Sequence, residues 1–338
     1  MAGAKQVIAL LSGHIEGDVE RVYTVALQIA ASEARQGHVK TAETLRKLVD
    51  SGRLREAPRP TRFASGAATP LGRPRGEVEE LMNVSEADKR LSDMTLTDAI
   101  RGRLDRFVTQ QQNRARLREF GKRPSARLLL VGPPGSGKTL TASALAGELR
   151  LPLYTVRLES VLTRFMGESA SKLRLVFDQI AQMRGVYLFD EFDAIGGRRG
   201  AQNDVGEIRR VLNSFLQFLE EANATDSVVV AATNHPELLD RALIRRFDEI
   251  IEYGLPDNEG VKAMVAQRLD QMAGKSLAWD KILPLAEGLS QAELARAADE
   301  ATKEAILAGK QSVGTADLVS ALAARRTMRE AVADIFTE

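Results

Sequence analysis

A glycine-rich stretch that ends in Lys and Thr is the part of the sequence best suited to chemistry. Residues 132–139 are Gly-Pro-Pro-Gly-Ser-Gly-Lys-Thr and match the pattern G-x-x-x-x-G-K-[ST] at every fixed position. The apolar run at 126–131 before them favours a buried strand, and the Leu- and Ala-rich run at 140–149 after them favours a helix. In such a setting, backbone N–H groups and the positive end of a helix point toward bound phosphate. We therefore predict a binding site for a nucleoside triphosphate.

The residues of this loop have separable roles. Gly135 and Gly137 can adopt backbone angles that a side chain would forbid, which leaves room for the anion. Lys138 can reach the β- and γ-phosphates, and the hydroxyl of Thr139 can ligate Mg²⁺. The strand and helix on either side disfavour the alternative, a glycine turn that matches by chance. The expected nucleotide-binding residues are Pro134, Gly135, Ser136, Gly137, Lys138, Thr139 and Leu140.

Two carboxylates follow the apolar run at 186–189. Asp190 can hold Mg²⁺ opposite Thr139, and Glu191 can orient and deprotonate the attacking water. An apolar run followed by Asp-Glu is common by itself, and it gains meaning here from the phosphate loop upstream. In an open α/β sheet, ligands bind at the carboxyl ends of the strands, so we expect these carboxylates beside the loop.

A second polar residue follows the buried run at 228–233. Asn234 can hydrogen-bond the γ-phosphate or help to position the water. Judged locally, it is also a suitable turn residue ahead of Pro236.

Composition excludes several classes of protein. The 338 residues include no Cys, which rules out disulfides, thiolate catalysis and cysteine metal sites. The formal net charge is +1, so bulk charge favours neither nucleic acid nor a membrane surface as a partner. Because we find neither a membrane-spanning apolar run nor a signal peptide, we expect a cytoplasmic protein with no membrane partner.

Apolar, strand-like runs alternate with helical segments in the middle of the chain, which is typical of a parallel sheet covered by helices on both faces. The expected strands are residues 126–131, 152–157, 185–189, 227–232 and 249–252. After Pro256 the strand signals stop and helices follow, including one at 291–308 that Gly309 would cap. The predicted fold class is an α/β phosphate-loop sheet, an all-helical lid domain, and a small helical N-terminal domain.

Four segments follow from this organisation. Residues 1–52 form a helical domain that either pads the main domain or binds a partner such as an adaptor or a protease. Residues 53–94 are a basic, Pro/Gly-rich linker and lead-in, in which a solvated tether is favoured over a nucleic-acid contact because no aromatic ladder accompanies the arginines. Residues 95–254 form the large α/β ATPase domain, and residues 255–338 form the helical small domain.

Over roughly residues 90–325 the sequence resembles the AAA+ ATPases, specifically the AAA subfamily in the narrow sense. Residues 132–139 match Walker A, residues 186–191 match Walker B, and Asn234 falls on the sensor-1 position. The resemblance implies that Arg245 and Arg246 are arginine fingers that reach the γ-phosphate of the neighbouring subunit. A cation beyond Lys138 is also what the charge on a transferred phosphoryl group needs. The alternative is a pair of surface arginines bonded to Asp240 or Asp248.

Two further features carry the resemblance. Arg245 and Arg246 are adjacent, as in the branch that contains katanin and spastin, whose members often place a three-helix microtubule-interacting-and-trafficking domain and a tether ahead of the ATPase. Phe165, Met166 and Gly167 match the first pore loop of AAA motors, which would grip extended polypeptide; the alternative is that Phe165 and Met166 pack into the core. Residues 196–207 would supply a second pore loop.

The resemblance implies an ATP-hydrolysing ring, a hexamer, that remodels, unfolds or threads a protein substrate through a central pore. The catalytic residues would be Lys138, Glu191, Asn234, Arg245 and Arg246. One alternative is a nucleotide-gated switch or clamp that binds a partner without threading it. Another is a DNA-associated protein, a hypothesis that only the basic tether supports.

Three departures from the family pattern bear on this hypothesis. The Asp-Gly-Phe inter-subunit signal is absent near residues 219–222, and the usual Ser-Gly-Ala is Ser-Gln-Ala at 290–292. No H-E-x-x-H metalloprotease motif is present, so a protease, if one is used, must be another polypeptide.

Overall fold

The structure is a computed structural model that describes residues 76–162, 168–193, 204–221, 225–239, 241–274 and 276–335. The predicted N-terminal domain at 1–52 and the start of the predicted linker lie outside the described residues. So do Phe165, Met166 and Gly167 of the predicted pore loop, together with most of the second predicted pore loop.

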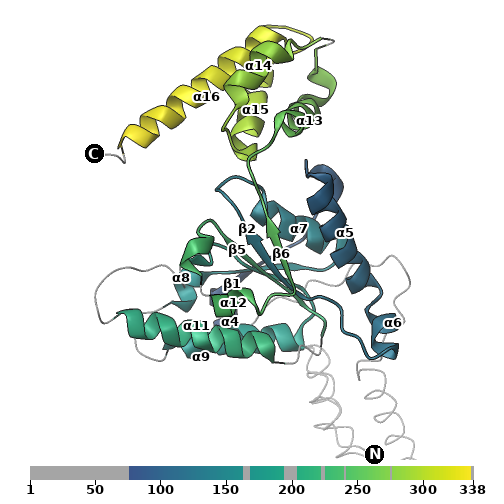
Figure 1. The fold of residues 1–338 in the computed structure, drawn as a ribbon, viewed down its shortest axis with the longest axis vertical. Helices are drawn as coiled ribbons and strands as arrows, with labels where there is room; N and C mark the ends of the chain where they lie inside the picture. Colours follow the sequence, from purple (N-terminus) through teal and green to yellow (C-terminus); the bar gives the residue numbers. More distant parts are fainter. Residues whose placement is uncertain are drawn as a thin grey trace, which may run out of the picture. The chain divides into compact units, whose positions relative to one another are not determined.

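A six-stranded sheet organises the α/β region, with the strand order β1-β3-β4-β5-β2-β6. Strands β2 to β6 pair in parallel, and β1 pairs with β3 in the antiparallel direction. The predicted parallel sheet is therefore confirmed, and the structure adds one antiparallel edge strand (Figure 1). The strands are β1 (Met82–Ser85), β2 (Arg127–Val131), β3 (Leu153–Val156), β4 (Val186–Phe189), β5 (Val228–Thr233) and β6 (Glu249–Glu252).

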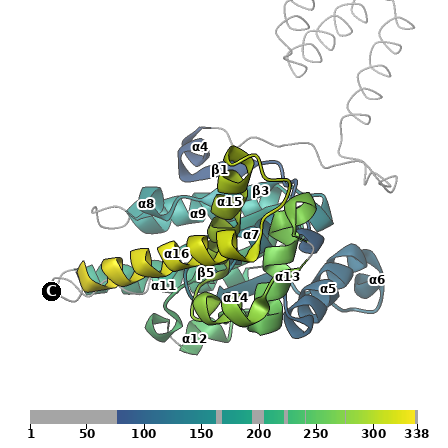
Figure 2. The same cartoon turned by 90° about the horizontal axis from the view of Figure 1, so that it is seen from above.

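Helices cover both faces of this sheet. Along β2, Leu128 and Leu130 are buried on the face of α5 (Asp98–Gln112) and α7 (Lys138–Leu149). Leu129 and Val131 are buried on the opposite face, with α9 (Glu168–Gln182) and α11 (Asp204–Glu220). Figure 2 shows α9 and α11 on one side of the sheet and α5 on the other. Because side chains alternate between the faces of a strand, a strand buried on both faces needs the continuous apolar sequence that 128–131 has.

An aromatic cluster joins α11 to the strand that precedes the two carboxylates. The Phe215 ring lies 5.2 Å from Phe189, 4.7 Å from Phe192 and 5.5 Å from Phe177, measured between ring centroids. Phe192 follows Glu191 directly in the chain and is fully buried. The packing of α11 is therefore coupled to the backbone that carries Glu191.

Short elements complete the α/β region. Within the stretch that we assigned to the linker and lead-in, the chain forms α4, β1 and a 3₁₀ helix, η1. The β1 strand has the sequence Met-Asn-Val-Ser, so it lacks the continuous apolar run by which the other strands were predicted. The short elements are α4 (Glu77–Leu81), η1 (Leu91–Asp93), α6 (Arg114–Glu119), α8 (Leu158–Val161), η2 (Pro236–Leu238) and α12 (Arg241–Ile244).

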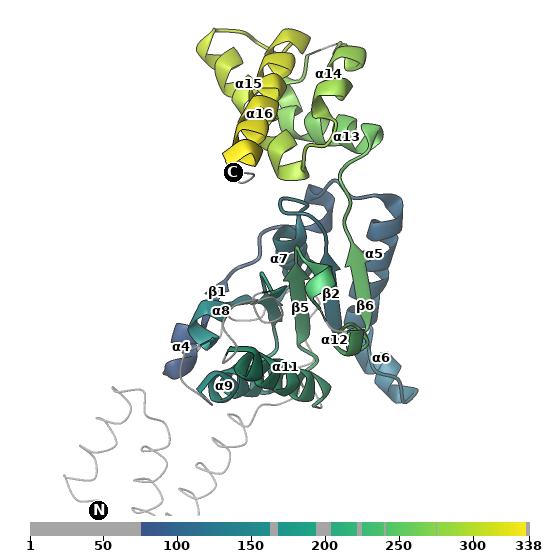
Figure 3. The ribbon, with the colours of Figure 1, turned by 60° about the vertical axis from the view of Figure 1, so that its left-hand side comes forward.

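Four helices and a 3₁₀ turn after β6 pack around their own apolar core, which includes Val265, Leu294 and Leu318 (Figure 3). They confirm the predicted helical region. Ser290 and Glu293 form a reciprocal capping box at the start of α15, which accounts for where that helix begins. The elements are α13 (Asn258–Leu269), η3 (Asp270–Met272), α14 (Trp279–Ala286), α15 (Gln291–Leu307) and α16 (Thr315–Ile335). No helix of the described residues is long and apolar enough to cross a membrane.

The aromatic cluster yields a test of stability. Phe215 is fully buried, so Phe215→Ala removes an aromatic ring from a close-packed site. We expect the free energy of unfolding to fall by about 3–5 kcal/mol, measured by denaturant titration followed by circular dichroism. The matched control is Asn213→Ala on an exposed position of the same helix, with an expected change within about 0.5 kcal/mol. Equal stability of the two variants would contradict the role given to the cluster.

Candidate functional site

The glycine-rich loop leaves the carboxyl end of β2 and runs directly into α7. Its backbone takes conformations with positive φ at Gly132, Gly135 and Gly137, with Gly137 at the start of the helix. A Cβ at Gly132 would lie 2.5 Å from the carbonyl oxygen of Tyr253, so a side chain does not fit at this position. The loop therefore closes tightly over the end of the sheet and presents its backbone at the start of α7, where an anion is stabilised.

Lys138 is the centre of a compact polar network. Its side chain is almost fully buried, and Nζ donates hydrogen bonds to the carbonyl oxygens of Gly132 and Pro133, each at 2.8 Å. Nζ also donates to Oδ1 of Asn234 at 2.7 Å, which brings two predicted catalytic residues together. Burial lowers the pKa of Lys138, and the negative charges of Asp190 and Asp193 act in the opposite direction. Lys138 is thus a desolvated amine, the state in which contact with a phosphate stabilises its positive charge most strongly.

The predicted metal ligands face one another. The Thr139 hydroxyl donates to Oδ2 of Asp190 at 2.7 Å, across the gap between α7 and the end of β4. Among the described residues, no group of three or more His, Cys, Asp or Glu side chains is arranged to hold a metal ion. This donor set fits Mg²⁺, which in phosphate sites uses one or two protein oxygens together with water and the phosphates of the substrate.

Glu191 lies beside this pair on a strained piece of backbone. Its φ is 50°, in the left-handed region that residues other than glycine rarely adopt, and its N–H donates to Oδ1 of Asp190 at 3.0 Å. The side chain is exposed. Strained backbone of this kind persists where the surrounding structure holds it, and it is common at active sites.

Sequence reasoning assigned no role to Asp193. Its Oδ1 accepts hydrogen bonds from the Thr233 hydroxyl at 2.9 Å and from the Asn234 N–H at 3.3 Å. This carboxylate therefore ties the segment after β4 to the end of β5 and orients Asn234. The sequence does show a third carboxylate two residues after Glu191, but nothing in it indicates that this carboxylate contacts Thr233 and Asn234.

Sequence reasoning also assigned no role to Thr141 and Tyr253. Their hydroxyl groups lie 2.6 Å apart, and the Thr141 hydroxyl also contacts the carbonyl oxygen of Gly137 at 2.9 Å. Burial raises the pKa of Tyr253 to about 12, so its hydroxyl stays protonated and available for this contact. The pair supports the loop through the contact with Gly137. Its two members come from segments far apart in the chain, so no local pattern reveals the contact.

Residues 290–292 of the helical region contact the loop directly. The Ala292 N–H donates to the carbonyl oxygen of Gly135 at 2.9 Å. A Cβ at Gly135 would lie 2.9 Å from both the Ala292 Cβ and the Ser290 Oγ, and one at Gly137 would lie 3.2 Å from Oε1 of Gln291. Nearby, the Thr95 hydroxyl donates to Oε1 of Gln267 at 2.8 Å. The Ser-Gln-Ala departure at 290–292 is therefore in contact with the predicted phosphate site.

Arg245 and Arg246 are placed elsewhere, in the turn directly after α12, and both are exposed. Arg246 pairs with Glu220, Nη1 to Oε1, at 2.7 Å. Asp248, an alternative partner suggested by the sequence, instead binds Arg127 at 2.6 Å at the beginning of β2. The loop is at the other end of that strand, and five residues of strand span about 16 Å. The structure therefore does not bring Arg245 or Arg246 to the loop of the same chain.

A cavity of about 700 Å³ opens beside the two carboxylates at the end of β4. Asp190, Glu191 and Asp193 line it together with Glu159, and Arg157 is the basic residue in its wall. The excess of carboxylates favours a cation or the arginine of a partner as its occupant.

The fold and the loop define a phosphate-loop ATPase. The sequence pattern of the family described as "ATPase family associated with various cellular activities (AAA)" matches residues 128–255. A relative named as an uncharacterised AAA family ATPase, y4kL of Sinorhizobium fredii, is 32% identical over 325 residues, which is 95% of each chain. The chain belongs to the AAA family of ATPases, and it hydrolyses ATP.

Other relatives are longer. An ATP-dependent zinc metalloprotease FtsH of Pseudomonas putida is 35% identical over 68% of this chain and 39% of its own length. FtsH 1 of Symbiobacterium thermophilum is 32% identical over 78% of this chain and 45% of its own length. The chain thus spans less than half the length of these metalloproteases, and its sequence has no H-E-x-x-H motif.

The contact between Gly135 and residues 290–292 yields a test of nucleotide binding. Gly135→Ala introduces a methyl group where Ala292 and Ser290 leave no room, at a residue whose φ is 75°. We expect the affinity for a fluorescent ATP analogue to fall roughly tenfold or more, because local strain of about 1–3 kcal/mol falls on the loop.

Gly121→Ala is the matched control, because Gly121 has a φ of 67° but nothing within 4 Å of its added Cβ. This variant carries the backbone strain alone and should bind the analogue as the unmodified protein does. Equal affinities of the two variants would show that the contact with residues 290–292 does not matter for binding.

Proposed function

We propose that this ATPase is a ring-forming motor, assembled as a hexamer, that couples ATP hydrolysis to the remodelling of a protein substrate. The observation that carries the proposal is the separation of Arg246 from the phosphate loop of its own chain. Asp248, two residues after Arg246, pairs with Arg127 at the beginning of β2, so Arg246 lies near that end of the strand. The phosphate loop begins at the other end of the same strand. A finger in this position can serve only the site of another copy.

Charge complementarity supports a shared site. The cavity beside Asp190 and Glu191 is rich in carboxylates, whereas Arg245 and Arg246 form an exposed basic pair in the turn after α12. The seam between neighbouring subunits would place that basic pair against the triphosphate of the next subunit. Closed rings arise when one surface of a subunit binds a different surface of the next, which this arrangement requires.

The residues of the site would divide the chemistry as follows. Residues 134–140 cradle the phosphates, and Lys138 balances the charge of the β- and γ-phosphates. Thr139 and Asp190 would hold Mg²⁺, which supplies charge neutralisation between the phosphates when bound. Glu191 orients the attacking water and accepts its proton, and Asn234, held by Lys138 and Asp193, fixes the position of that water. Arg246 of the next subunit stabilises the charge that develops on the transferred phosphoryl group.

The proposed substrate is a protein segment drawn through a central pore past Phe165, Met166 and Gly167. Its support is the family position of this triplet and the naming of the longer relatives as ATP-dependent metalloproteases. The partner proposed for such a task is an adaptor or a protease that residues 1–52 bind. The adjacent arginines support membership of the katanin- and spastin-like branch, which stays a prediction. A cytoplasmic location also stays a prediction.

Subunit mixing tests the shared site. Arg246→Ala should lower ATPase activity by on the order of 100-fold or more, and Glu191→Gln should bind ATP without hydrolysing it. Mixed together, the two variants should regain activity, because each Arg246→Ala subunit beside a Glu191→Gln subunit receives an intact finger. Phosphate release measured across mixing ratios reports the recovery.

The control mixes Arg246→Ala with the double variant Arg246→Ala/Glu191→Gln, in which no finger is present and no activity should return. Absence of recovery at every ratio of the first pair would contradict the shared site.

Phe165→Ala separates threading from the alternative of a nucleotide-gated clamp. We expect this variant to retain ATPase activity and to lose ATP-dependent unfolding of the protein partner captured by the Glu191→Gln variant. Phe120→Ala, which removes an aromatic ring that is 73% exposed elsewhere on the chain, is the control and should leave unfolding unchanged. Unchanged unfolding by Phe165→Ala would favour the clamp.

A further inference from the structure

The last residue of α11 holds the predicted finger. Oε1 of Glu220 lies 2.7 Å from Nη1 of Arg246, and the two side chains are 46% and 45% exposed. A guanidinium group has five N–H donors in a planar fork, and this contact uses one of its nitrogens. Arg246 can therefore keep Glu220 and still donate hydrogen bonds to phosphate oxygens, so the ion pair orients the finger without blocking it.

The position of Glu220 is set by the aromatic core of its own chain. Leu219 and Phe215 of α11 are buried, and Phe215 packs against Phe192, the residue after Glu191. The carboxylate that holds Arg246 therefore stands at the end of a helix whose packing depends on the Glu191 segment. The packing of α11 therefore connects Glu191 of one site to Arg246, which is proposed to act at the site of the neighbouring subunit.

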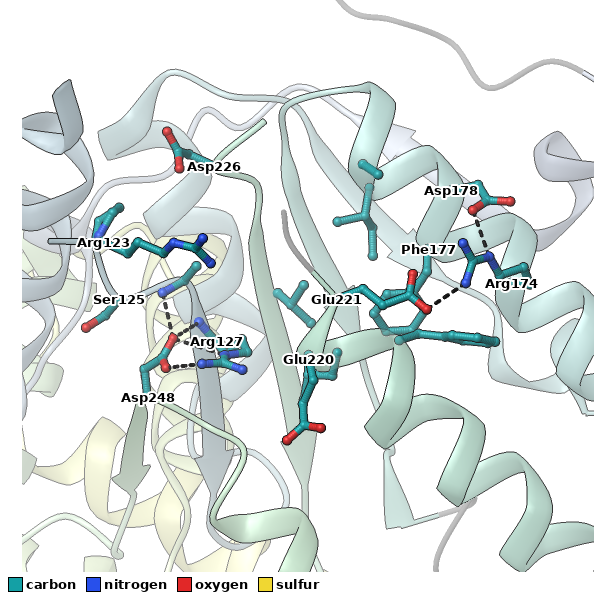
Figure 4. A pocket seen from close by; sticks show the side chains of 17 residues that line it. Arg123, Ser125, Arg127, Arg174, Phe177, Asp178, Glu220, Glu221, Asp226 and Asp248 are labelled. Atoms are coloured by element: carbon teal, nitrogen blue, oxygen red, sulfur yellow. Dashed lines mark hydrogen bonds and ion pairs between the residues drawn. The ribbon is translucent and has the colours of Figure 1, made fainter. Parts of the chain in front are cut away.

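The neighbouring residue faces a different partner. Glu221 pairs with Nη1 of Arg174 on α9 at 2.7 Å, and Arg174 also binds Asp178 and lies over the ring of Phe218. Figure 4 shows Glu221 turned toward Arg174 and Glu220 turned away from it, at the edge of a cavity of about 290 Å³ at the amino ends of the strands. Two adjacent glutamates of similar exposure thus have separate partners, and only Glu220 contacts Arg246.

We propose that Glu220 is a positioning residue for hydrolysis in the neighbouring subunit, where it orients Arg246 toward the triphosphate. This rests on the proposed function, because it requires that Arg246 act in trans. Glu220 stands in the segment 219–222, where the sequence has Leu-Glu-Glu-Ala in place of Asp-Gly-Phe. In that segment, the ion pair between Glu220 and Arg246 connects the end of α11 to the proposed arginine finger.

The test compares steady-state ATPase kinetics of the full chain at a protein concentration at which it is assembled. Glu220→Ala should lower kcat about three- to fivefold, as expected for an exposed ion pair, and leave KM within about twofold. A lower kcat at constant KM is expected when an interaction made only in the transition state is lost. Circular dichroism spectra and assembly equal to those of the unmodified protein exclude a general loss of structure as the cause. Glu220→Gln keeps an oxygen that accepts from the guanidinium and should recover part of the loss, and Glu221→Ala should behave as the unmodified protein does.

A double variant shows whether the effect passes through Arg246. In the Arg246→Ala background, Glu220→Ala should have no further effect, because the group that it positions is gone. A kcat of Glu220→Ala equal to or above that of the unmodified protein overturns the inference, and so does an additive effect in the double variant or a loss of assembly with an unchanged kcat. Full activity of Arg246→Ala alone would instead overturn the shared site, so the two failures are distinguishable.

Discussion

The buried ammonium group of Lys138 is surrounded by oxygen atoms from two separate segments of the chain. Two are backbone carbonyls of the glycine-rich loop and the third is the side chain of Asn234 at the end of β5. Removing a charge from water costs free energy unless hydrogen bonds and opposite charges replace the lost solvation. The loop, the strand order and the carboxylates Asp190 and Asp193 together meet that requirement. The same arrangement stabilises a triphosphate, whose negative charges are the strongest partner available to Lys138.

The parallel sheet separates two kinds of residue. The carboxyl ends of β2, β4 and β5 bring Lys138, Asp190, Glu191 and Asn234 to one edge. The turn after α12, with Arg246, is at the amino end of β2, where the Arg127–Asp248 pair fastens it. Because the length of a strand lies between them, Arg246 does not reach the phosphate loop of its own chain. The proposed motor therefore requires several copies of the chain to assemble.

The comparisons place this arrangement in a family and show where the chain differs from its longer relatives. The similarity to the S. fredii ATPase runs over 95% of both chains, whereas the metalloproteases match over less than half of their length. The family pattern at residues 128–255 contains the loop and the carboxylates.

The sequence by itself determined the sheet, the loop and the chemical type of the site. Those features follow from local pattern: an apolar run for each buried strand, glycines at fixed spacing for the loop, and Asp-Glu directly after β4. It did not reveal β1, whose residues Met-Asn-Val-Ser form no apolar run. Nor did it reveal the roles of Asp193, Thr141 and Tyr253, whose partners are distant in the chain.

The tertiary structure decided which residues meet. Residues 290–292 contact Gly135, Arg246 pairs with Glu220, and Asp248 pairs with Arg127 instead of with either predicted arginine finger. Adjacent glutamates at 220 and 221 are equivalent in the sequence and differ only in the direction that the end of α11 gives them. Such contacts depend on packing between elements, because the periodicity of a segment specifies which face is buried but not which neighbour covers it.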